Sequence, residues 1–161
     1  MSTRCYVGKE NENGTVRMVY VHCDGHPTTI GPVLLWYYSD DNLDKLLDLG
    51  ALDCISTTIQ TCKSFHRDYG EPKQIEIVES VTKAITFGGS GIEWVHIRRK
   101  NGEWESYNCR NCNERIPLAI ALERTGIDEE DFKMRIRLIH ILATAPFEEA
   151  SDIFNKYLES F

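Results

Sequence analysis

The sequence predicts a single α+β domain in which an antiparallel sheet is packed against helices. Asn-Gly dipeptides at 13–14 and 101–102 each separate two strand-like segments, as in β-hairpins. A leucine-rich helix is expected soon after the first hairpin, and from about residue 113 the apolar spacing is helical. The 161 residues suit one core, so we predict a sheet-rich part over 1–112 and a helical part over 113–161 packed on the sheet.

The first hairpin joins strands expected at 4–8 and 15–23. In the second strand both alternating sets contain apolar residues, which predicts a central or well-covered position in the sheet. Residues 24–27 are predicted as a turn, and Gly31-Pro32 as the start of a short helix over 33–38. A second helix is expected from a Ser39-Asp40-Asp41 cap to Gly50, which favours a left-handed end.

After residue 50 the sequence predicts an irregular segment, three strands and three helices. Residues 51–72 are expected to be irregular, and 74–79 alternate as a strand. Strands at 92–99 and 103–109 form the second hairpin. Three helices are then expected, over 116–124, after a cap at Asp128, and after Pro146. The glycine-rich stretch 88–91 is predicted as a flexible turn, since no Lys-Ser/Thr pair follows as in a phosphate-binding loop.

The net charge and the lack of an export signal indicate which partners and which compartment to expect. The formal net charge is −7 and the isoelectric point about 5.2, which disfavours sequence-independent binding to duplex nucleic acid. The acidity is compatible with a basic protein partner, with mimicry of a nucleic-acid backbone or with plain solubility. No export signal or apolar stretch of ~20 residues is present, so we expect a cytoplasmic protein without a membrane span, whose six cysteines are reduced.

Two polar groups are candidate ligand sites. If residues 22–26 stayed extended, His22, Asp24 and His26 would share one face, with a spacing suited to a divalent metal. A packed strand histidine and a turn-forming aspartate are the structural alternative. His66, Arg67 and Asp68 lie in the predicted irregular segment. Arg67 is expected either to bind a phosphate or carboxylate, or to form an ion pair with Asp24 or Asp68 that holds a long loop in place.

Cysteines and aromatic residues provide two further candidates. Cys109 and Cys112 form one CxxC, which we expect to be structural thiols and no cofactor site, with half of a zinc site or a redox pair as the alternatives. Trp36, Tyr37 and Tyr38 are consecutive, so a helix cannot bury all three on one face. We expect a partner-binding surface there or core packing. No catalytic nucleophile stands beside a base in the sequence.

A resemblance covers roughly residues 4–71. It rests on Tyr20-Val21-His22-Cys23-Asp24-Gly25-His26-Pro27, on Gly31, Leu34-Leu35 and Tyr38, on Leu49-Gly50, and on His66-Arg67-Asp68-Tyr69-Gly70-Glu71. These segments resemble a family of small uncharacterised phage and prophage proteins with a strand close to Tyr-Cys-His-Trp-Asp-Gly-Tyr-Pro. The family offers no activity to carry over. The resemblance implies an origin in a phage or mobile element and a role in manipulating the host.

These observations favour a phage or mobile-element accessory protein that binds a host protein in the host cytoplasm. It would inhibit or redirect that factor, for example a defence protein, without catalysis. The alternative is a binding protein or hydrolase for a nucleotide or other small molecule, with His22, Asp24, His66, Arg67 and Asp68 as its site. A virion assembly protein is a third hypothesis, which predicts defined oligomers.

Overall fold

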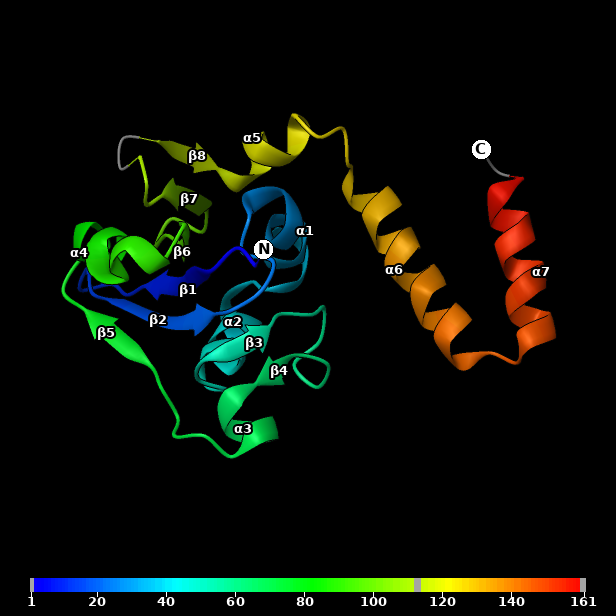
Figure 1. Cartoon of the computed structure of the whole chain (residues 1–161). Helices are drawn as coiled ribbons and strands as arrows, with labels where there is room; N and C mark the ends of the chain where they lie inside the picture. Colours follow the sequence, from blue (N-terminus) through cyan, green and yellow to red (C-terminus); the bar gives the residue numbers. More distant parts are fainter. Residues whose placement is uncertain (1, 112–113, 160–161) are drawn as a thin grey trace. The chain divides into compact units, whose positions relative to one another are not determined.

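The computed structural model describes residues 2–111 and 114–159, and has an α+β fold (Figure 1). The chain divides into two compact units, Met1–Thr125 and Gly126–Phe161. The first unit contains the whole sheet and five of the helices, and the second consists of two helices. Within the described residues, no helix has the length and apolar character needed to cross a lipid bilayer.

The sheet is mixed, whereas the sequence predicted an antiparallel one. Its order is β4-β3-β2-β1-β6-β7-β8, with β5 paired to the start of β2. Pairs β1·β6 and β2·β3 are parallel and the others antiparallel. Parallel neighbours need long crossover connections, which local sequence patterns do not reveal. The strands are β1 (Cys5–Glu10), β2 (Val16–Val21), β3 (Leu52–Cys54), β4 (Lys63–Ser64), β5 (Glu76–Val78), β6 (Trp94–Arg98), β7 (Trp104–Asn108) and β8 (Arg115–Pro117).

Both Asn-Gly sequences lie where two antiparallel strands are joined. Strands β1 and β2 pair from Cys5↔Val21 to Glu10↔Val16, and Gly14 between them has φ +83°. Strands β6 and β7 are joined in the same way, with Gly102 at φ +87°. A positive φ costs glycine little because it has no Cβ, and the chain can therefore reverse in a few residues.

The helices of the first unit differ in part from the predicted ones. Helix α1 already begins at Pro27, because His26 serves as its N-cap: its Nδ1 accepts a hydrogen bond from the backbone N–H of Thr28 (3.3 Å). Ser80 caps the unpredicted α4 by accepting a bond from Lys83 N (3.2 Å). The predicted irregular segment 51–72 contains β3, β4 and α3. The helices are α1 (Pro27–Tyr37), α2 (Asp40–Leu47), α3 (Phe65–Tyr69), α4 (Val81–Phe87) and α5 (Leu118–Glu123), with a 3-10 turn at Gly89–Gly91.

The sheet of the first unit is covered on both faces, as the alternation in β2 predicted. Helices α1, α2 and α5 pack on one face, where Val19 and Val21 of β2 are fully buried. Helix α4 covers the opposite face, where Val16 and Met18 are fully buried. A strand buried on both faces cannot shift its register without moving apolar side chains out of a core, so β2 fixes the positions of its neighbours.

The second unit consists of α6 (Glu129–Thr144) and α7 (Phe147–Leu158), joined by a short turn (Figure 1). Asp128 caps α6 as the sequence predicted, since its Oδ1 accepts a bond from Asp131 N (2.8 Å). None of the described side chains of α6 is buried. Packing of α6 and α7 on the sheet stays a prediction, whereas α5 does contact β7 and β8.

Candidate functional site

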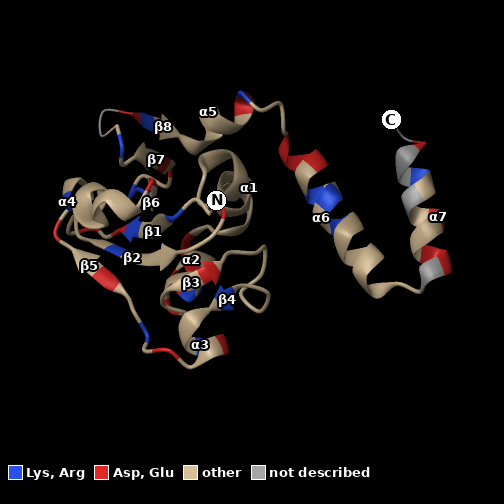
Figure 2. Cartoon of the chain, viewed as in Figure 1, with Lys and Arg blue, Asp and Glu red and all other residues tan. Residues whose placement is uncertain are grey.

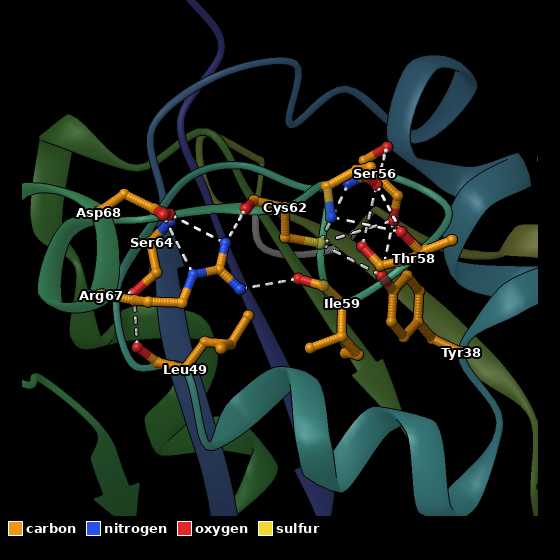
Figure 3. A network of polar contacts seen from close by, with 10 residues as sticks. Tyr38, Leu49, Ser56, Thr58, Ile59, Cys62, Ser64, Arg67 and Asp68 are labelled. Atoms are coloured by element: carbon orange, nitrogen blue, oxygen red, sulfur yellow. Dashed lines mark hydrogen bonds and ion pairs between the residues drawn. The ribbon is translucent and has the colours of Figure 1, made fainter. Parts of the chain in front are cut away.

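Arg67 is the centre of a polar network that connects α3 with the loop before β4 (Figure 3). Its Nη1 donates to the carbonyl oxygen of Ile59 (3.0 Å) and its Nη2 to that of Cys62. Its Nε and Nη2 also bind the two carboxylate oxygens of Asp68, at 3.1 and 2.9 Å. The carboxylate in turn accepts from Ser64 N (2.8 Å). Each nitrogen of the guanidinium therefore has a partner within its own chain.

The geometry of this pair shifts both pKa values. The hydrogen bond from Arg67, followed by that from Ser64 N, lowers the pKa of Asp68, and the bond to Asp68 raises the pKa of Arg67. His66 belongs to the same loop, where its Nδ1 donates to the carbonyl oxygen of Glu71 (2.7 Å). This arrangement favours the structural interpretation of His66, Arg67 and Asp68 over an anion-binding pocket.

Of the three consecutive aromatic residues, Tyr38 lies in the core. It is 1% exposed, its hydroxyl donates to the carbonyl oxygen of Ser56 (2.6 Å), and Cys62 Sγ lies 3.2 Å away (Figure 3). A buried ring cannot contact a partner, so Tyr38 is removed from the predicted partner-binding surface. Trp36 and Tyr37 are half-buried, and Tyr37 packs against the core.

Three candidate metal ligands come together where β2 ends beside β3. Beyond Val21 the pairing continues, since His22 N donates to Leu52 O and Cys23 N to Asp53 O, both at 2.9 Å. Ligand atoms of His22, Cys23 and Asp53 consequently lie within 4.8 Å of one another, and all three residues are half-buried.

Asp24 and His26 do not join His22 in this group, in contrast to the predicted spacing. Asp24 has φ +62° and is exposed, so the chain bends where the prediction required it to stay extended. His26 is occupied as the cap of α1, and its ring contacts that of Trp94 with centroids 5.5 Å apart. Asp53 was missed because it is 31 positions from His22 in sequence and lies in a strand of three residues.

A buried histidine that the sequence did not single out holds the bend after β2. His96 is fully buried, and its Nε2 donates to the carbonyl oxygen of Gly25 (2.8 Å). Its Nδ1 lies 2.7 Å from Ser106 Oγ, which therefore acts as the donor. Burial lowers the pKa of His96 to about 4, so the ring is neutral at pH 7.

A buried ion network on β7 was also missed. Glu105 is 2% exposed and accepts from Arg99 Nη1 (2.6 Å), from Arg115 and from the Tyr107 hydroxyl. Arg99 also binds Glu10, 8% exposed, at 2.8 Å. Burial alone would raise the pKa of Glu105, but the bonds from Tyr107 and Arg99 lower it. The alternation of residues in β7 was a signal that could have placed Glu105 on a buried face. The network itself was missed because its partners come from three different segments.

The described cysteines are free thiols. Cys112 lies outside the described residues, so the predicted zinc half-site at Cys109 and Cys112 stays a prediction. Cys5 is fully buried, which raises the pKa of its thiol well above the usual range and makes it a poor nucleophile.

Two shallow cavities of about 330 and 320 Å³ lie on the first unit, at the small end of the range for ligand pockets. The larger contains charged residues, but Lys9 is paired with Asp44 and Arg99 with Glu10. The other lies between Tyr38 and residues 57–60. None of the six predicted ligand-binding residues lines either cavity.

Comparison of the chain with protein-family models, with curated proteins and with solved structures finds no match. The candidate site is therefore described from its own geometry. Two groups stand out: the His22–Cys23–Asp53 cluster where β2 ends beside β3, and the exposed apolar side chains of α6.

Proposed function

We propose that this chain is a non-catalytic binding protein that docks onto another protein through α6. The observation that carries the proposal is the exposure of apolar side chains on two sides of one helix. Met134 and Ile141 are 47% and 37% exposed and lie seven positions apart, on the same side. Ile139 is 61% exposed and lies about 140° around the helix from Met134.

Among the described residues of the second unit, α7 is the one other helix, and it contacts α6. One neighbouring helix can cover one side of α6, which leaves the other apolar side without a partner inside the unit. A piece of 36 residues is also too small to bury a core of its own. Exposed apolar side chains on an amphipathic helix are typical of helix-in-groove binding.

The charge of this unit indicates the chemistry of the partner. Residues 126–161 carry eight acidic and four basic side chains, hence a net charge of −4. The first turns of α6 and α7 are acidic, with Glu129, Glu130, Asp131, Glu148 and Glu149 (Figure 2). Within α6 the acidic residues are confined to the first turn and are followed by Lys133, Arg135 and Arg137, so the complementary surface is an apolar groove with basic groups opposite that first turn. A second copy would bring like charges together, which favours a different protein over self-association.

Support for a role without catalysis comes from the first unit. The guanidinium of Arg67 and the carboxylate of Asp68 bind each other and the backbone, and His26 caps a helix. Side chains whose polar atoms are used in this way have little capacity left for a substrate.

The nature of the partner is a further part of the proposal. The resemblance of residues 20–27 and 66–71 to phage and prophage proteins supports a host protein in the host cytoplasm, such as a defence factor, whose activity is inhibited or redirected. Because the second unit is acidic, binding should weaken as ionic strength rises.

The test uses the full-length chain and two matched charge insertions. Ile139→Glu changes the exposed face of α6, and Ile77→Glu changes an even more exposed isoleucine (70%) on β5. Host proteins captured by wild type are purified, and their binding is measured by calorimetry at two salt concentrations. We expect Ile139→Glu to abolish a saturable, salt-sensitive interaction that Ile77→Glu retains.

Three results would contradict the proposal. Equal binding by both variants would exclude α6 as the contact. Light scattering that shows a dimer lost in Ile139→Glu would assign the face to self-association. A large loss of thermal stability in Ile139→Glu would show that the side chain is packed within its own chain.

A further inference from the structure

His22, Cys23 and Asp53 offer one nitrogen, one sulfur and one oxygen ligand within a single small volume. The three ligand atoms lie within 4.8 Å of one another and the residues are half-buried. No other group of three His, Cys, Asp or Glu side chains in the described ranges meets this spacing. The proposed docking role of α6 does not use these residues, so their convergence calls for a separate explanation.

The backbone that carries the three side chains is hydrogen-bonded across two strands. His22 N and Cys23 N donate to Leu52 O and Asp53 O, both at 2.9 Å. The carbonyl oxygen of His22 accepts a bond from Ser2 Oγ, and Gly25 N donates to Thr3 O (2.9 Å). Ligands held on paired strands are positioned before a metal arrives, which lowers the entropic cost of binding.

The distances suit a tetrahedral ion. Bonds of about 2.0–2.3 Å to zinc place neighbouring ligand atoms roughly 3.3–3.8 Å apart. Cys23 Sγ and Asp53 Oδ1 are already 3.8 Å apart, with the thiol as donor to the carboxylate. A metal ion would displace that thiol proton to solvent and bind the resulting thiolate, while small side-chain rotations bring the third ligand in.

Tyr20 orients the histidine. Its hydroxyl lies 2.8 Å from Nδ1 of His22, and with Nδ1 used in this bond we assign Nε2 as the nitrogen that takes the metal. Metal-binding histidines ordinarily donate their other ring N–H to such an oxygen, which fixes the tautomer and the ring plane. The ring of Phe65 packs edge-on to His22 with centroids 6.4 Å apart and adds an apolar wall.

We propose that His22, Cys23 and Asp53 form a zinc-binding site with three protein ligands and one open position. The thiolate and imidazole favour zinc over magnesium or calcium, and the carboxylate is a common third zinc ligand. The open position takes a water molecule or a group from a bound molecule. The site differs from the predicted His22–Asp24–His26 set in two of its three members.

The experiment titrates Co²⁺, a spectroscopic substitute for zinc, into the reduced, metal-free, full-length protein. We expect a thiolate-to-cobalt charge-transfer band that saturates at one equivalent and disappears when Zn²⁺ is added. Cys23→Ser should remove the band. Asp53→Asn should weaken cobalt binding, whereas the matched control Asp24→Asn, next to the site but outside it, should bind as wild type does.

Tyr20→Phe tests the site through its metal affinity, a quantity that would not change if the cluster were purely structural. Loss of the orienting hydroxyl should weaken metal affinity about 10–100-fold while the band keeps its shape. Circular dichroism of each metal-free variant shows that it is folded, and Asp53→Asn replaces Cys23→Ser as the decisive variant if the latter unfolds. Absence of a band at one equivalent would overturn the proposal, as would a band that survives Cys23→Ser or is lost in the double variant Cys109→Ser/Cys112→Ser.

Discussion

At the scale of single residues, a polar side chain is structural or functional according to which groups its hydrogen-bond donors and acceptors bind. In the sequence, Arg67 was compatible with an anion site as well as with the favoured role of holding a long loop in place. In the structure its donors go to Asp68 and to the carbonyl oxygens of Ile59 and Cys62. Its side chain is 35% exposed, so the ion pair itself contributes little, and the bonds to the backbone matter more.

Arg67→Ala should therefore destabilise the protein moderately. We expect the free energy of unfolding in urea to fall by about 1 kcal/mol, because two loop carbonyls lose a charged donor but remain close to water. Arg110→Ala is the control: Arg110 is 70% exposed and 3.4 Å from Glu93, and its loss should have almost no effect. Equal effects of the two variants would contradict the role of Arg67 as a loop tie.

His96 predicts a dependence of stability on pH. Its pKa is about 4 in the folded protein and 6.5 in a free histidine, so the unfolded chain binds more protons between these values. Stability should therefore be complete above pH 6.5 and fall as the pH drops towards 4, by roughly 2–3 kcal/mol. Unfolding curves at several pH values measure this loss. His96→Gln should flatten the pH profile; an unchanged slope in this variant would assign the loss to other groups.

At the scale of elements, the bend after β2 is held by close packing. Gly25 lies so near the first strand that an added Cβ would be 2.7 Å from the Cβ of Cys5 and 2.9 Å from the carbonyl oxygen of Thr3. Neither atom can move easily, since one belongs to a buried strand residue and the other to the backbone. The bend therefore requires glycine for lack of space, although its φ is not positive.

Gly25→Ala should destabilise the protein by about 1–3 kcal/mol, the usual cost of overpacking. Gly91→Ala is the matched control, because nothing lies within 4 Å of its added Cβ and its φ is not positive. Thermal unfolding of both variants measures the difference. A Gly25→Ala protein as stable as wild type would show that the segment 24–27 can shift away from β1.

At the scale of the whole molecule, the core and the proposed docking helix lie in different units. The buried apolar side chains of the described residues lie at or before Leu122, with Ala150 as the exception. The first unit thus has a complete two-sided core, while the second depends on contacts that its two helices cannot supply alone.

Truncation after Thr125 should accordingly leave the fold of the first unit intact. We expect the shortened chain to unfold cooperatively, at a urea midpoint close to that of the full-length protein, because almost no buried apolar side chain is removed. It should also lose the partner binding proposed for α6. A marked drop in midpoint or a loss of cooperativity would mean that α6 and α7 complete the core of residues 1–125.

The sequence by itself predicted the features that depend on neighbouring residues. The positive φ of Gly14 and Gly102, the two-sided burial of β2 and the cap at Asp128 follow from residue type and short-range periodicity. The start of α1 was missed because a histidine cap is uncommon. Strands β3 and β4 were missed because two or three residues carry no periodic pattern.

Only the tertiary structure decided which distant residues meet. Parallel pairing of β2 with β3 brings Asp53 to His22 and Cys23, and β6 brings His96 beneath Gly25. Such contacts are set by the crossover of the chain through α1 and α2 and by burial on both faces of the sheet, which no local window of sequence contains. The bend at Asp24 separated the residues that simple alternation had placed together.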